Sequence, residues 1–75
     1  MKELIEFIAK SIVNAPDDVV VTEEENEQGI LLKLQVAEED KGRVIGKQGR
    51  VAQAMRTILK VKAAKQGTRA TLEII

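Results

Sequence analysis

Apolar residues recur at helical spacing near the N-terminus and at alternate positions further along the chain. The first set predicts an amphipathic helix over residues 3 to 13, with these core positions: Ile5, Ile8, Ala9 and Ile12. Phe7 flanks the set and is also a core candidate. Residues 19 to 22 are β-branched and begin a strand, and the alternation over residues 30 to 36 predicts a second one. A turn at residues 26 to 29 joins the two strands into a hairpin.

The second half of the chain predicts two helices and a closing strand. Acidic residues 38 to 40 favour a helix N-terminus, and the short helix they begin runs to Ile45, where Gly46 stops it. A longer helix follows Gly49 and ends near residue 66. Its expected core face consists of Val51, Ala54, Met55, Ile58 and Val61. Alternation over residues 69 to 74 predicts the last strand.

The predicted order is therefore αββααβ. Short connections and the absence of repeats or linkers favour one domain over residues 1–75. We expect an α+β fold in which three helices pack on one face of a three-stranded sheet.

The residue inventory excludes several functional classes. The chain has no Cys and no His, which excludes disulfides, thiolate zinc sites and His-based catalysis. We expect no metal site, no cofactor and no enzymatic activity. No apolar run is long enough to span a membrane, and the acidic start of the chain is unlike a signal peptide, so a cytoplasmic protein is expected.

Charge is distributed very unevenly although the formal net charge is +0. Residues 1–40 hold three lysines and eleven carboxylates, a net charge of −8, whereas residues 41–75 hold nine basic residues and one carboxylate, a net charge of +8. We expect a basic surface in the second half and a solvated acidic cluster at residues 23 to 27. The alternative is that the two halves neutralise each other across the fold.

The motif with chemical content is a glycine-containing loop between the two central helices. Residues 43 to 50 read Arg-Val-Ile-Gly-Lys-Gln-Gly-Arg, and the two glycines allow a tight turn that a ligand can approach closely. The following helix N-terminus presents unpaired N–H groups and positive potential, which favours an anion. Four basic residues surround the loop: Lys41, Arg43, Lys47 and Arg50. Taken alone, a G-x-x-G segment also fits a purely structural turn.

In this setting the segment resembles the G-x-x-G loop of KH domains in the type II arrangement, and the resemblance covers essentially the whole chain. In such domains the loop clamps the backbone of about four nucleotides of single-stranded RNA. Residues 43 to 50 further resemble the small, single-domain bacterial KH proteins of the KhpA type. That resemblance implies a cytoplasmic RNA-binding protein, RNA chaperone or post-transcriptional regulator that pairs with a larger KH-containing partner and influences cell shape and cell wall synthesis.

The resemblance also assigns roles within the predicted RNA-binding set, which is Arg43, Ile45, Gly46, Lys47, Gln48, Gly49 and Arg50. The glycines shape the loop, Lys47 and Gln48 face the RNA backbone, and Arg50 lies near phosphate at the helix entrance. Val44 and Ile45 either line the base groove or fill the core. Arg56 and Lys60, four residues apart on the next helix, extend a basic track.

Two other functions fit the pattern. The chain is alternatively a protein interaction module that forms a homodimer or docks to a larger KH-containing protein through the margin of the last helix, at Ala52, Leu59 or Ala63. An enzyme that uses the loop to hold a phosphate would need a P-loop Lys-Ser/Thr pair, which the loop lacks. Small size and the absence of disulfides predict self-association.

Overall fold

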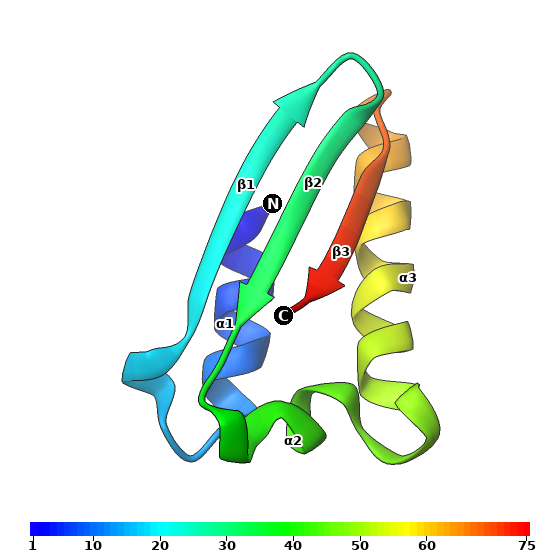
Figure 1. Cartoon of the computed structure of the whole chain (residues 1–75). Coiled ribbons are helices and arrows are strands. Elements are labelled where there is room, and N and C mark those ends of the chain that lie inside the picture. The colour runs from blue at the N-terminus through cyan, green and yellow to red at the C-terminus, as the bar shows by residue number, and fades with distance from the viewer.

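The computed structural model describes residues 1–75, and its helices and strands follow the order that the sequence predicts (Figure 1). The elements are α1 (Lys2–Ile12), β1 (Val20–Asn26), β2 (Gly29–Gln35), α2 (Lys41–Ile45), α3 (Arg50–Lys65) and β3 (Ala70–Ile74). Single 3₁₀ turns connect some of them, at Pro16–Asp18, Glu38–Asp40 and Lys47–Gly49.

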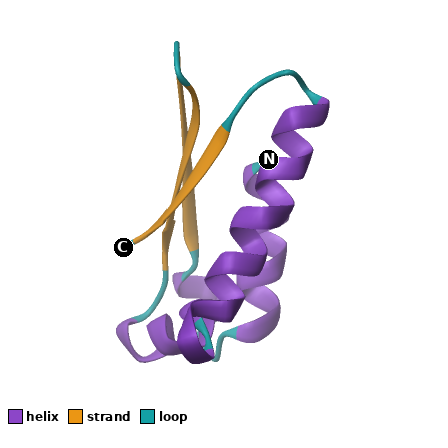
Figure 2. Ribbon diagram, turned by 90° about the vertical axis from the view of Figure 1, so that its right-hand side faces the viewer, coloured by secondary structure: helices purple, strands orange, loops and turns teal.

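The sheet has the strand order β1-β2-β3 and is mixed. β1 and β2 form the expected antiparallel hairpin, and β3 then pairs in parallel with β2, so that Leu32 lies opposite Leu72. All three helices lie on the same side of this sheet (Figure 2). The α+β class and the αββααβ order are thus confirmed, and the arrangement is that of a type II KH domain.

One core lies between the helices and the sheet, as the alternation in β2 predicts. Leu32 and Leu34 are fully buried, and they pack with Ile5 and Ala9 from α1. The remaining members come from the other elements: Val19, Val21, Val36, Val44, Met55, Leu59 and Leu72. Burial of these side chains is the main favourable contribution to folding, because removal of apolar surface from water supplies most of the driving force.

The predicted core face of α3 is confirmed at Met55 and in part at Val51, which packs half-buried against the core, but it is wrong at the other three positions. The buried residues of α3 are Ala52, Met55, Leu59 and Ala63. Ile58 and Val61 are instead 44% and 53% exposed. Ala52, Leu59 and Ala63, which the sequence suggested as a contact surface, are therefore buried in the core. The exposed apolar residues of α3 are instead Ile58 and Val61, which the sequence assigned to the core.

Phe7 was also wrongly expected in the core, since it is 72% exposed. At 100° per residue it lies about 200° around α1 from the buried Ile5, so both cannot face the sheet. The buried stripe of α1 follows Ile5 and Ala9, with Ile8 and Ile12 partly buried against it.

Candidate nucleic-acid interface

The loop between α2 and α3 is built on two glycines with positive φ. Gly46 adopts φ 79°, ψ 171°, and its N–H donates to the Gly42 carbonyl at 2.8 Å, which ends α2. A Cβ at Gly46 would overlap the Val51 side chain and lie 2.8 Å from the Val51 backbone nitrogen. Gly49 adopts φ 75°, ψ 14°, and its N–H donates to the Gly46 carbonyl at 3.1 Å. Glycine at position 46 is thus required both by the backbone conformation and by space.

Gln48 lies at the tip of this loop in a left-handed conformation, with φ 58° and ψ 24°. It is the one residue other than glycine with positive φ in the chain. An L-residue pays roughly 1–2 kcal/mol in this region, so the turn holds Gln48 against its local preference. Arg50 donates to the Gln48 side-chain oxygen at 3.4 Å. Strain of this kind concentrates at ligand-binding segments.

The four basic residues around the loop differ in how far carboxylates neutralise them. Lys47 makes no ion pair, and Arg50 contacts only the neutral Gln48. Lys41 pairs with Glu38 at 3.1 Å, and the Arg43 Nε lies 3.8 Å from Asp40. The uncompensated charge is therefore concentrated at the loop and the start of α3.

The hairpin carboxylates lie away from this charge, as predicted. Figure 1 shows the β1–β2 turn at one end of the molecule and the loop at the other. Glu23 contacts the N-terminal amino group at 3.7 Å and Glu24 contacts Lys33 at 3.7 Å, and neither pairs with a basic residue of the loop. The alternative, mutual neutralisation of the two halves, applies to Lys41 and Arg43, which lie beside carboxylates of the first half, but not to Lys47 and Arg50.

Val44 and Ile45, which the sequence left open between core and surface, take different positions. Val44 is fully buried and belongs to the core, whereas Ile45 is 40% exposed at the end of α2. Ile45 is thus the apolar side chain of this pair that a ligand at the loop can contact.

Asp40 has a structural role that the sequence did not reveal. Its carboxylate is fully buried and accepts the backbone N–H groups of Asn14 and Ala15, each at 3.1 Å. The sequence suggested only that its charge favoured a helix N-terminus. These bonds join the segment after α1 to the start of α2, and so they hold the helix that leads into the loop.

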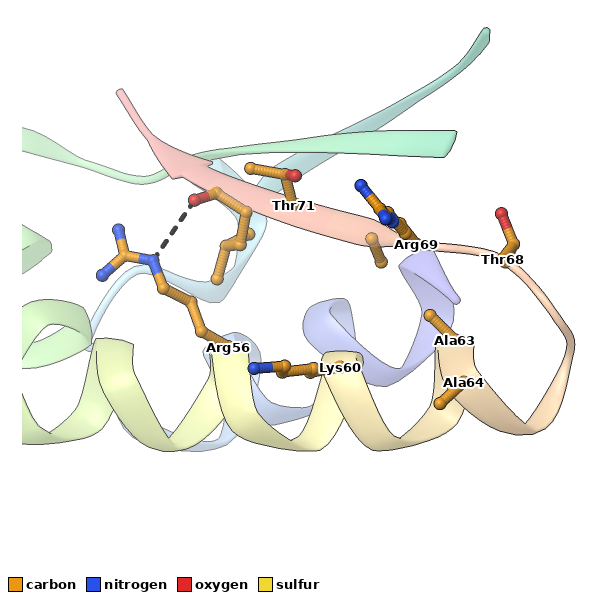
Figure 3. A pocket seen from close by; sticks show the side chains of 9 residues that line it. Arg56, Lys60, Ala63, Ala64, Thr68, Arg69 and Thr71 are labelled. Atoms are coloured by element: carbon orange, nitrogen blue, oxygen red, sulfur yellow. Dashed lines mark hydrogen bonds between the residues drawn. The ribbon is translucent and has the colours of Figure 1, made fainter. Parts of the chain in front are cut away.

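A groove of about 560 Å³ runs between α3 and β3 (Figure 3). Arg56 and Lys60 line it from α3, in agreement with the basic track expected there. The other lining residues are Ala63, Ala64, Thr68, Arg69, Ala70, Thr71 and Leu72. Sequence reasoning missed the β3 wall of this groove, because the parallel pairing of β3 with β2 decides which edge faces α3.

The KhpA/KhpB KH-domain model matches residues 2–74. The chain belongs to this family. Among its KhpA relatives, the RNA-binding protein KhpA of Clostridium acetobutylicum is 56% identical over 75 residues, which is 100% of both chains. The KhpA of Listeria monocytogenes is 49% identical over 100% of this chain and 99% of its own. The KhpA of Treponema pallidum is 49% identical over 99% of this chain and 92% of its own.

No solved structure gives a significant match to this chain. The KhpA relatives are named as RNA-binding proteins and not as enzymes, which agrees with the prediction that the chain has no catalytic activity. No helix is both long and apolar enough to cross a membrane.

Proposed function

We propose that this chain binds single-stranded RNA, with the sugar-phosphate backbone at the G-x-x-G loop and the bases in the groove between α3 and β3. The observation that carries the proposal is the structure of the loop. Its two glycines have no side chains to keep a ligand from the start of α3, and Lys47, which makes no ion pair, lies between them. Membership of the KH family and the RNA-binding KhpA relatives support the same function.

The predicted binding residues contribute different kinds of contact to RNA. Gly46 and Gly49 remove the side chains that would keep phosphate from the backbone N–H groups. Lys47 and Arg50 supply charge, Gln48 supplies a polar contact, and Ile45 offers an apolar surface to the nearest base. Arg43 is held partly by Asp40, so it contributes less than the resemblance implies.

The chain has no aromatic residue in the groove, so stacking on rings does not contribute to affinity. Binding of a short single strand is therefore weak, on the order of micromolar, and tolerant of sequence. Such binding suits an RNA chaperone or post-transcriptional regulator. We propose that residues 1–75 act as a single KH domain in this role in the cytoplasm, with the link to cell shape and cell wall synthesis that the family resemblance implies.

The test replaces Lys47 and Gln48 together by Asp. Both glycines remain, so the turn persists, while two negative charges occupy the path of a phosphate. Fluorescence anisotropy with a labelled RNA octamer, at several salt concentrations, measures the affinity. For two or three neutralised phosphates, the wild type gives a slope of log K against log salt of roughly −1.4 to −2. We expect the double variant to lose at least tenfold in affinity while circular dichroism shows an unchanged fold.

The matched control makes an equal change of charge elsewhere, Lys2→Asp with Thr22→Asp. Both residues are exposed, and Thr22 lies on β1, at the edge of the sheet opposite the groove. The net charge changes equally, so a purely non-specific effect weakens both variants alike. If the loop variant is folded and binds as tightly as the wild type with the same salt slope, the loop is only a structural turn.

We also propose that the domain self-associates through the exposed apolar side of α3. Ile58 and Val61 border a shallow hollow with Thr57, Lys62 and Lys65, and they are too exposed to contribute much to the core. The occupant we propose is the same surface of a second copy. A larger KH-containing partner, implied by the family resemblance, would compete for it.

Light scattering after size exclusion tests this self-association. Ile58→Asp should give a monomer, whereas Gln53→Asp, an exposed position on the same helix, should leave the oligomeric state unchanged. A wild type that remains monomeric at high micromolar concentration would overturn the proposal.

A further inference from the structure

The side chains that line the groove donate hydrogen bonds far better than they accept them. Arg56, Lys60 and Arg69 carry only donors, and none of the nine lining residues is Asp, Glu, Asn or Gln. The only side-chain acceptors are the hydroxyl groups of Thr68 and Thr71. Any other acceptor must come from the backbone of β3.

The unpaired edge of β3 presents the Leu72 carbonyl at the end of the groove nearer the start of α3, and Arg56 occupies this acceptor. β3 pairs with β2 along one edge, and its other edge is unpaired in the sheet. From that edge the Leu72 carbonyl points toward α3, where the Arg56 Nε donates to it at 3.4 Å (Figure 3). The bond is long, but it places the guanidinium across the groove with its remaining N–H groups available to a ligand.

Arg69 and Thr71 contribute less to the interior of the groove. In Figure 3 both side chains lie on the far side of β3 from α3, whereas Arg56 and Lys60 are on the helix side. The donors that a base meets between α3 and β3 are therefore mainly those of Arg56 and Lys60.

We propose that this groove discriminates among bases in favour of uracil and guanine, and that Arg56 is the residue that determines the preference. The proposal rests on RNA binding as proposed above and specifies its ligand. Uracil O4 and guanine O6 are carbonyl acceptors, for which the Arg56 guanidinium is a matching donor. Cytosine and adenine carry an amino group at the same position. This amino group would face the N–H donors of Arg56, and the Leu72 carbonyl already accepts a hydrogen bond from Arg56.

Two pairs of RNA octamers test the preference with stacking and ring size held nearly constant. The first pair is U8 and C8. The second pair is I8 and A8, which contain no uridine that could take the place of the tested base; inosine presents the guanine O6 edge and lacks the 2-amino group. Measured by anisotropy at one salt concentration, the carbonyl-bearing member of each pair should bind about fivefold more tightly, the lower end of discrimination by a good base contact.

Variants of Arg56 test its role. Arg56→Met removes the donors and frees the Leu72 carbonyl to accept an amino group, so both ratios should fall to about one or invert. Arg56→Lys keeps the charge and hence the salt slope, but it loses the planar fork, and the ratios should fall without a large loss of overall affinity. Lys62→Met is the control: it removes one charge from α3 outside the groove and should leave both ratios unchanged.

The outcomes separate this inference from the proposed function. If the wild type binds all four octamers equally, with the expected salt dependence, RNA binding stands and the preference is refuted. If it binds none of them, the proposed function itself fails. A preference that survives in both Arg56 variants would refute the role of Arg56, and circular dichroism excludes unfolding as a cause of any loss.

Discussion

Removal of the Asp40 carboxylate should destabilise the domain more than the loss of any surface charge. Asp40 is fully buried, and its two oxygens accept the N–H groups of Asn14 and Ala15, each at 3.1 Å. Arg43 stands 3.8 Å from one of these oxygens. The carboxylate thus satisfies two backbone donors that no other group in the chain contacts.

The magnitude follows from the donors that the substitution leaves unpaired. Asp40→Ala orphans both N–H groups, and each partly buried donor costs about 1–2 kcal/mol, so the loss is about 2–4 kcal/mol. Asp40→Asn keeps one acceptor but turns an NH₂ group toward the other donor, so it costs nearly as much despite its equal size. Each kcal/mol lost from the free energy of unfolding lowers the thermal unfolding midpoint of a domain this small by about 4–8 °C. Asp40→Ala should therefore lower that midpoint by roughly 10–30 °C.

Thermal and urea unfolding, followed by circular dichroism, measure this loss. The control is Glu39→Ala, which removes an exposed carboxylate from the same 3₁₀ turn and should change stability by less than about 0.5 kcal/mol. Equal m-values would show that the variants unfold from similar native states. If Asp40→Asn and Asp40→Ala both unfold within about 0.5 kcal/mol of the wild type, the two hydrogen bonds contribute little and the reasoning is refuted.

Three further substitutions test the backbone of the loop region by urea unfolding. Gly46→Ala should cost about 3 kcal/mol or more, because its conformation is nearly restricted to glycine and its Cβ would meet Val51, whereas Gly49→Ala, with no atom within 4 Å of its Cβ, should cost only about 1–2 kcal/mol. Equal costs would contradict the steric argument. Gly42→Ala, inside α2 with open space around its Cβ, should stabilise the domain by about 0.5–1 kcal/mol, and a loss of stability would contradict this.

The order of the elements was predictable because each depends on local signals. The β2 alternation places Leu32 and Leu34 inward, and the glycines at 46 and 49 end one helix and begin the next. These signals depend only on residues close together in the sequence, so they can be recognised without knowledge of the tertiary structure.

The orientation of α3 was not predictable in the same way, because this helix carries two apolar stripes. The bulkier stripe holds Ile58 and Val61, and the smaller one holds Ala52 and Ala63 around Leu59. The centres of the stripes differ by about 150° around the helix. Ala52 and Ala63 have small side chains, so α3 can lie close to the sheet when their stripe faces it. Which stripe faces the sheet therefore depends on packing and does not follow from the number of apolar residues in each stripe.

Asp40 and the β3 wall of the groove were missed for a related reason. The partners of Asp40 lie 26 and 25 positions earlier in the chain, and no periodicity connects a carboxylate with distant backbone N–H groups. The groove likewise needs β3 beside β2, a pairing that the alternation over residues 69 to 74 does not specify. The loop residues were predictable as a motif, but their different degrees of neutralisation were not.

The two proposed interactions of α3 should respond to salt in opposite directions and should reinforce each other. α3 carries Arg50, Arg56, Lys60, Lys62 and Lys65 and no carboxylate. Self-association through Ile58 and Val61 therefore brings like charges together, so that added salt should strengthen it, while the same salt weakens RNA binding.

RNA bound in the groove would neutralise some of this charge from the other side of the helix. The repulsion between two copies should then fall, and by linkage RNA should raise the self-association constant by the same factor by which self-association raises RNA affinity. Sedimentation at low salt, with and without saturating U8, measures the first factor. Anisotropy titrations at protein concentrations below and above the dissociation constant of self-association measure the second. If U8 leaves self-association unchanged or weakens it, repulsion between the two copies of α3 does not oppose the contact, and the apolar side of α3 is not where the copies meet.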